Sequence, residues 1–188
     1  MTARAMSTAL PTPPEHRPSP RELLGFLEAH VGTRRAAVLC AEVLGDDDPH
    51  DHAETVLFLG GAGGRDVLDG GRSWPPYWAR VWGARGLLYV WDDSCAPVVL
   101  DRLDDEAWRV SEMCLKVSAR RELPCGDAAL RLSSHELPRV RATAARALGA
   151  CGDTEHLDAL LDLLDDPAEE VRRAAGRARE RMERRLDV

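Results

Sequence analysis

Four copies of a helical pattern, each centred on a valine, recur in the sequence at a nearly constant interval. The segments YWARVWGARGLL, AWRVSEMCLKV, LPRVRATAARAL and AEEVRRAAGRA align on Val81, Val110, Val140 and Val171, which are 29, 30 and 31 residues apart. Such a period is typical of repeat proteins, in which each unit is one supersecondary element that buries its apolar face against its neighbours. We therefore expect stacked copies of one helical unit.

Each valine is followed by mostly small or apolar residues three, four and seven positions later, which places them on one side of a helix. These residues are Ala84 and Leu88 in the first copy, Met113, Cys114 and Val117 in the second, Thr143, Ala144 and Ala147 in the third, and Ala174, Ala175 and Ala178 in the fourth.

A shorter apolar helix ending in an acidic turn precedes three of these helices. The clearest case runs from His156 to Leu164 and is followed by Asp165, Asp166 and Pro167. We expect Asp166 to cap the next helix through its carboxylate and Pro167 to occupy the first helical position. In the preceding unit, residues 96–103 lead through Asp104 and Asp105 to a helix over about 106–121. Each unit is thus predicted to be helix, tight turn, helix.

The rest of the chain also reads as helical once the N-terminus is set aside. Residues 1–20 contain five prolines among small polar residues, a composition typical of a disordered tail. After residue 20 no stretch shows the sustained period of two that marks a half-buried strand. The sequence therefore predicts an all-α fold over residues 21–188.

The residues of the later copies resemble the HEAT-like repeats, in the variety of about thirty residues that is related to the repeats of phycobilisome lyases. The resemblance is clearest in VRATAARALGACGD and DDPAEEVRRAAGRA, within residues 126–188, moderate over 75–125 and weak over 21–74. It implies a right-handed α-solenoid over residues 21–188, with divergent repeats in 21–74 and clearer ones in 75–188. It also implies that a partner binds along the concave face.

The helix after Pro75 and Pro76 carries two neighbouring stripes of apolar and aromatic residues, which we call together the aromatic stripe. One interpretation is an internal helix covered by neighbouring repeats, since aromatic stripes at helical spacing usually lie in the core. The other is a contact face, because tryptophan, tyrosine and arginine dominate binding hot spots. The candidate partner-binding residues are Trp74, Trp78, Trp82, Arg85, Tyr89 and Trp91.

Arginines flank the repeat valines and acidic residues fill the turns. Arginine paired with a turn carboxylate of an adjacent unit would form a ladder that fixes the register of the repeats. The alternative is a row of cations that reads an anion. The residues involved are Arg80, Arg109, Arg139, Arg141 and Arg172, with Asp93, Asp105 and Asp166 as carboxylates. The mixed charges of the last helix indicate a solvated cap.

Composition and motifs argue against catalysis and cofactor binding. The five cysteines form no CxxC pair, and the ligand-rich run of residues 46–52 has no recognisable partners for a metal site. The glycine-rich residues 60–64 lack the lysine of a phosphate loop. We expect no catalytic residue, no metal and no cofactor. No apolar run reaches the ~18 residues that span a bilayer, and we expect a cytoplasmic protein with reduced thiols.

These observations favour a non-enzymatic scaffold that binds a protein or peptide through a concave surface containing Trp and Arg. A second hypothesis is nucleic-acid recognition, since some alkylpurine DNA glycosylases are built from HEAT-like repeats; Trp82, Trp91, Asp92 and Asp93 would serve there. The net charge of −7 disfavours it, because duplex binding depends on phosphate neutralisation. A third is a lyase-like chaperone for a bilin, which rests on the repeat resemblance.

Overall fold

A computed structural model describes residues 10–14 and 18–187, and within them all regular secondary structure is helical, which confirms the all-α prediction. Contacts divide the chain into two compact units, the first ending at Val98 and the second beginning at Val99. Part of the predicted tail, residues 1–9 and 15–17, lies outside the described residues. Residues 10–14 have no regular structure, and Pro20 already belongs to the first helix. No described helix is long and apolar enough to cross a membrane.

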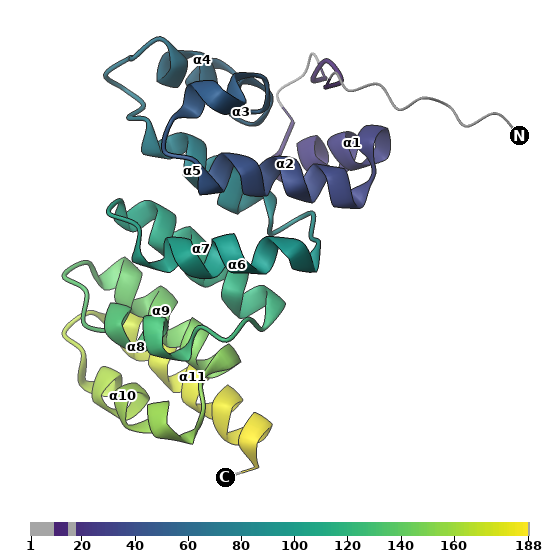
Figure 1. The fold of residues 1–188 in the computed structure, drawn as a ribbon. Helices are drawn as coiled ribbons and strands as arrows, with labels where there is room; N and C mark the ends of the chain where they lie inside the picture. The colour runs from purple at the N-terminus through teal and green to yellow at the C-terminus, as the bar shows by residue number, and fades with distance from the viewer. Residues whose placement is uncertain (1–9, 15–17, 188) are drawn as a thin grey trace, which may run out of the picture. The chain divides into compact units, whose positions relative to one another are not determined.

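In its described residues, the first unit (Figure 1, purple to blue-green) is built mainly of five helices. These are α1 (Pro20–Val31), α2 (Thr33–Gly45), α3 (Ala53–Gly60), α4 (Ala62–Leu68) and α5 (Tyr77–Gly86), with the short 3-10 helices η1 (Pro49–His52) and η2 (Asp93–Cys95). Helix α1 begins with a capping box in which Ser19 and Glu22 satisfy each other's backbone N–H groups. Its C-cap is Gly32, which has a φ of +83°, a backbone conformation that is unfavourable for residues with a side chain.

Helices α2 and α5 pack closely because glycines face the contact. A Cβ atom on Gly83 would lie 2.6 Å from the carbonyl oxygen of Cys40, and one on Gly86 would collide with the Cys40 thiol. Cys40 is fully buried, and burial raises the pKa of its thiol to about 12. Gly83 and Gly86 are therefore packing positions, and Cys40 is a core residue.

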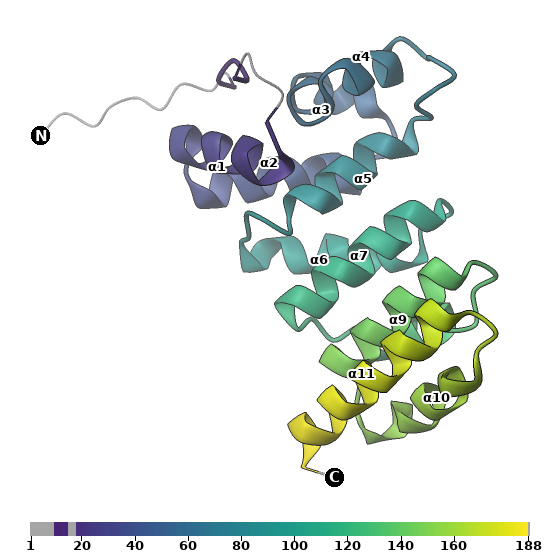
Figure 2. The ribbon, with the colours of Figure 1, turned by 180° about the vertical axis from the view of Figure 1, so that it is seen from behind.

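The second unit consists of helix-turn-helix pairs in two layers, the arrangement of an α-solenoid. One layer holds α7 (Trp108–Arg121), α9 (Pro138–Cys151) and α11 (Glu169–Leu186), which lie side by side in Figure 2. The other holds α8 (Gly126–Leu132), α10 (Leu157–Asp162) and the part of α6 (Ala96–Asp101) that follows Val98. The 3-10 helices η3 (Arg102–Asp104), η4 (Thr154–His156) and η5 (Leu163–Asp165) extend or precede the short helices.

The repeat valines occupy core positions, as the alignment predicts. Val110, Val140 and Val171 are 0% exposed, and Val81 in α5 is 4% exposed. The residues at helical spacing after them are small, and this lets α9 and α11 approach closely: a Cβ atom on Gly149 would lie 2.6 Å from the Cα of Ala178. The packing stripe is thus the seam between successive repeats.

The predicted start of the last helix is wrong by two residues. Helix α11 begins at Glu169 with Ala168 as N-cap and no side-chain cap, so Pro167 lies outside the helix. The reason is that Asp166 Oδ1 accepts a hydrogen bond from the Ala168 N–H at 2.8 Å, forming a tight turn before the helix. Asp105 accepts from the Ala107 N–H in the same way, and α7 begins at Trp108.

Candidate partner-binding site

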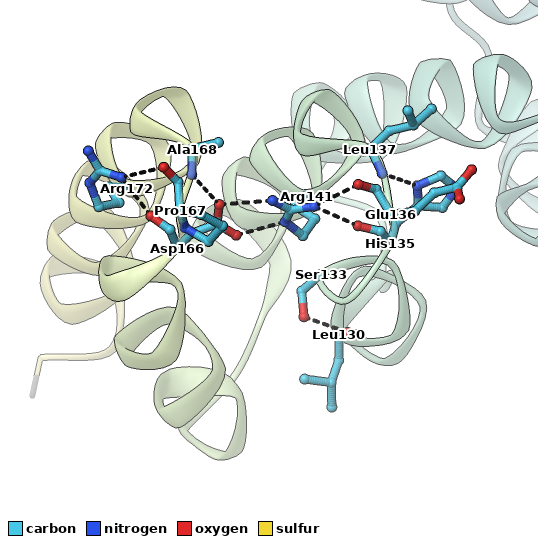
Figure 3. A network of polar contacts seen from close by, with 10 residues as sticks. All are labelled: Leu130, Ser133, His135, Glu136, Leu137, Arg141, Asp166, Pro167, Ala168 and Arg172. Atoms are coloured by element: carbon cyan, nitrogen blue, oxygen red, sulfur yellow. Dashed lines mark hydrogen bonds and ion pairs between the residues drawn. The ribbon is translucent and has the colours of Figure 1, made fainter.

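One buried ion pair joins two successive turns of the second unit (Figure 3). Arg141 donates to both carboxylate oxygens of Asp166, from Nε at 2.7 Å and Nη2 at 2.9 Å, and its Nη1 donates to the carbonyls of His135 and Glu136. The two side chains are 13% and 6% exposed. The hydrogen bond from Arg141 lowers the pKa of Asp166. The guanidinium therefore fastens the turn of its own repeat to the turn of the next.

The turn between the two helices of a repeat occurs three times in the second unit, and its hydrogen-bond acceptor is an aspartate in two turns and a histidine in the third. Asp105, His135 and Asp166 each accept the N–H of the residue two positions later, and in the middle turn the acceptor is His135 Nδ1, 3.0 Å from the Leu137 nitrogen. A histidine accepts there only with Nδ1 unprotonated. The irregular middle turn thus keeps the geometry of its neighbours.

In the second unit, the side chain of the residue after each repeat valine donates a hydrogen bond to a carbonyl of the turn that precedes its helix. Ser111 donates to the Asp105 carbonyl at 3.0 Å, and Arg172 donates to the Asp166 and Pro167 carbonyls at 2.6 and 2.9 Å. Arg172 therefore holds the turn of its own repeat, and its predicted role in an inter-repeat ladder is wrong. Asp105 also lies 3.5 Å from Arg102 of the same hairpin.

The three arginines that precede the repeat valines have different kinds of partner. Arg80 is 4% exposed and lies 3.2 Å from Asp47, Arg109 lies over the Trp108 ring at 4.2 Å, and Arg139 donates to Glu112 at 2.8 Å. These contacts do not form one row that reads an anion. Asp93, expected to pair with an arginine, instead accepts the indole N–H of Trp91 at 2.8 Å.

The aromatic stripe is divided between core and surface. Trp82 is only 4% exposed, so its predicted role as a contact residue is wrong. Its ring lies against the α3–α4 junction, where a Cβ atom on Gly60 would collide with it and one on Gly63 would lie 3.2 Å from it. The glycine-rich segment therefore leaves space for the indole ring of Trp82. The fit depends on segments about twenty residues apart, which sequence periodicity does not reveal.

The other stripe residues are more accessible but differ among themselves. Trp74 and Trp78 are half-buried, with ring centroids 4.8 Å apart in an edge-to-face arrangement. Trp91 is half-buried too, and Tyr89 is 37% exposed. Arg85 is half-buried, and its burial lowers the pKa of the guanidinium. The stripe is not one open face.

A groove of about 460 Å³ crosses the layer formed by α7, α9 and α11. Its floor is small or apolar and its rim is cationic. The floor residues are Leu115, Ala119, Thr143, Ala174 and Ala178, and the cations are Lys116, Arg120, Arg146, Arg177 and Arg181. Every one of these residues belongs to the second unit.

Three of the cations occupy the same position in successive repeats. Lys116, Arg146 and Arg177 each follow their repeat valine by six residues, so they form a row with one cation per helix. We call Lys116, Arg146 and Arg177 the cation row. Sequence reasoning missed it because the charges of α11 were read as a mixed solvated cap. The valine register would have revealed it, since equivalent positions of a repeat share a face.

Two carboxylates, Glu112 and Glu122, neutralise two of the groove cations, Lys116 and Arg181, and leave the others charged. Glu112, 2% exposed, lies 2.7 Å from Lys116 and 2.8 Å from Arg139. Burial alone would raise the pKa of Glu112, but the hydrogen bonds from Arg139 and Lys116 outweigh it and the pKa is lowered. Among the described residues, neither Arg146 nor Arg177 has a carboxylate within 4.0 Å, and both are exposed.

Two clusters with metal-capable side chains have structural roles. Ligand atoms of Asp127, Glu155 and His156 lie within 4.8 Å of one another. However, His156 Nδ1 accepts the Asp153 N–H at 3.0 Å, so the proton of the neutral ring is on Nε2, the nitrogen that faces Asp127 at 3.6 Å. A metal would have to displace that proton. We therefore interpret His156 as the cap of its turn.

The second cluster is the acidic run before α3. Asp48 accepts the N–H of His50 and caps η1, and Asp46 lies 3.2 Å from His52 Nε2. The backbone N–H of Asp48 lowers the pKa of Asp46. These contacts are those of a capped acidic loop.

Comparison with known proteins identifies the repeats of the second unit. Residues 127–182 match the family model of HEAT repeats, a segment that runs from α8 into α11 and includes Arg146, Arg177 and the Arg141–Asp166 pair. No curated protein matches the chain significantly. The match concerns HEAT repeats in general and does not test the likeness to phycobilisome lyases. Residues 127–182 are therefore similar to HEAT repeats, and the match covers less than half of the chain.

Proposed function

We propose that this chain is a non-enzymatic scaffold and that the groove of α7, α9 and α11 is its contact surface for a partner protein. HEAT repeats generally serve as protein-interaction scaffolds. The observation that supports this particular surface is the cation row above an apolar floor. A cytoplasmic location, as expected from the sequence, belongs to the same proposal.

The cation row differs from the other arginines of the repeats in what it does for the fold. Arg141 and Arg172 hold turns, and Arg139 neutralises a buried glutamate. Arg146 and Arg177 are exposed and have no such partner among the described residues. Exposed arginines beside an apolar patch are typical of protein interfaces, where arginine is enriched. Their alignment on one face therefore supports binding rather than stability.

The accessible aromatics of the first unit support a second contact area on the same scaffold. Trp74 and Trp78 pack against each other and are half-buried, and Tyr89 is exposed. Together with Arg85 and Trp91 they supply the tryptophan and arginine chemistry expected of a contact surface. Trp82 is not part of it.

Site-specific photo-crosslinking tests the proposed surface. A photoreactive phenylalanine analogue replaces Arg146 in the groove or, as a control, Asp158 on the exposed side of α10. We expect protease-sensitive, nuclease-resistant adducts in source cells from position 146 and not from 158. Adding Arg177→Glu should abolish them. Equal adducts from both positions, or none from 146, would contradict the proposal.

A further inference from the structure

We infer that the partner presents to the groove an acidic segment in an extended, polyproline II-like conformation, with a carboxylate at about every third residue. The inference rests on the proposed function and specifies the chemistry of the partner.

The charge of the groove favours an anionic occupant. Lys116 is neutralised by Glu112, and Arg181 lies 3.4 Å from Glu122. Arg120, Arg146 and Arg177 have no carboxylate within 4.0 Å among the described residues. The groove therefore carries a local positive charge in a chain whose net charge is −7. Complementary charge steers a partner to such a patch and fixes its register.

The spacing of the row favours a particular backbone. Packed helices lie about 8–10 Å apart, so cations at one position of successive helices are separated by about that distance. A polyproline II segment has three residues per turn and rises about 3.1 Å per residue, so side chains three apart lie on one side at about 9 Å. Carboxylates three residues apart would thus face Arg146 and Arg177, and a third would lie beside Lys116, which Glu112 already neutralises.

The floor of the groove favours a peptide over a nucleic acid. The floor residues Leu115, Ala119, Ala174 and Ala178 are small or apolar, and all but Ala119 are at most 4% exposed, so the floor suits small apolar side chains between the carboxylates. Single-stranded nucleic acids bind largely by stacking bases on aromatic side chains, and none of the residues lining this groove is aromatic.

Fluorescence anisotropy with the full chain and a defined probe tests the inference. The probe is a labelled peptide of sequence EPVEPAEPV. The comparison peptides are EEEPVPAPV, which has the same composition with contiguous glutamates, and KPVKPAKPV. A twelve-nucleotide thymidylate strand represents the nucleic-acid alternative. We expect EPVEPAEPV to bind at least threefold more tightly than EEEPVPAPV and the other two probes to bind more weakly still.

Paired charge reversals locate the binding. Arg146→Glu with Arg177→Glu should weaken binding of EPVEPAEPV at least tenfold. The matched control reverses Arg173 and Arg184, which are exposed on α11 outside the groove and pair with Glu169 and Glu180, and should change affinity less than twofold. Circular dichroism checks that both variants fold.

Four outcomes would overturn the inference: no binding of EPVEPAEPV, equally tight binding of EEEPVPAPV, equal loss in both double variants, or tighter binding of the thymidylate strand. If EPVEPAEPV fails but crosslinks from position 146 to proteins persist, the groove binds a partner of other chemistry. If the crosslinks are also absent, the proposed function fails as well.

Discussion

The two units of this molecule solve the same packing problem with different residues. In the second unit, small side chains let α9 and α11 approach closely, and a half-buried hydrogen bond recurs at each turn. In the first, an indole fills the space and glycines make room for it. The comparison shows that a repeat pattern in the sequence can be kept while the packing that it supports is replaced.

A single position carries the difference. The residue after the repeat valine is Ser111, Arg141 or Arg172 in the second unit, and each donates to a carbonyl of its own turn. In the first unit the same position is Trp82, whose buried ring lies on Gly60. At this position, the second unit has a side chain that hydrogen-bonds to a turn, and the first unit has a side chain that packs in the core.

The largest expected effect comes from removing that indole. Trp82→Ala should lower the free energy of unfolding by about 3–5 kcal/mol, because it leaves a large cavity against α3 and α4. Urea denaturation followed by circular dichroism measures it. Tyr89→Ala, at an exposed position of the same stripe, should cost less than about 1 kcal/mol. Equal losses would show that the stripe is not divided as described.

In the second unit, the corresponding test breaks the buried pair. Arg141→Ala should cost about 2–4 kcal/mol, since it leaves the buried Asp166 carboxylate without its main partner. Arg173→Ala removes an exposed pair with Glu169 and should cost less than about 0.5 kcal/mol. The same denaturation measurement compares the two variants, and similar losses would argue that Arg141 has no special role.

The pH dependence of stability should reflect the buried carboxylates of the second unit. The pKa values of Asp166 and Glu112 are lowered in the folded chain, so between the unfolded and folded values the unfolded state binds more protons. Stability should therefore be present above about pH 4, near the unfolded value, and fall as the pH drops further. Asp166→Asn should make that fall shallower. Parallel curves for the two proteins would contradict this assignment.

The smallest effect is expected at the middle turn. His135→Asp should change stability by less than about 1 kcal/mol, because aspartate accepts the equivalent N–H at Asp105 and Asp166. His135→Ala removes the acceptor for the Leu137 N–H and should cost about 0.5–1.5 kcal/mol. Thermal unfolding distinguishes them. A larger loss in His135→Asp than in His135→Ala would mean that the three turns are not equivalent.

Much of the fold was predictable because its signals are local and periodic. The valines at a thirty-residue interval predicted the buried positions, and the apolar spacing predicted the helix pairs. The predicted start of α11 was wrong because an aspartate before a helix can either cap the helix or close a turn. In the structure the Asp166 carboxylate accepts the Ala168 N–H and closes a turn, and the helix begins two residues later than predicted. The candidate site was harder to see, since its cations come from three helices.

The sequence by itself determined the helical repeat and its register, because these depend on the spacing of side chains along one chain. Only the tertiary structure decided that Trp82 is buried, that Glu112 neutralises Lys116, and that Arg146 and Arg177 line the same groove without carboxylate partners among the described residues. Burial and charge compensation depend on neighbours brought together from distant segments, and periodicity does not identify those neighbours.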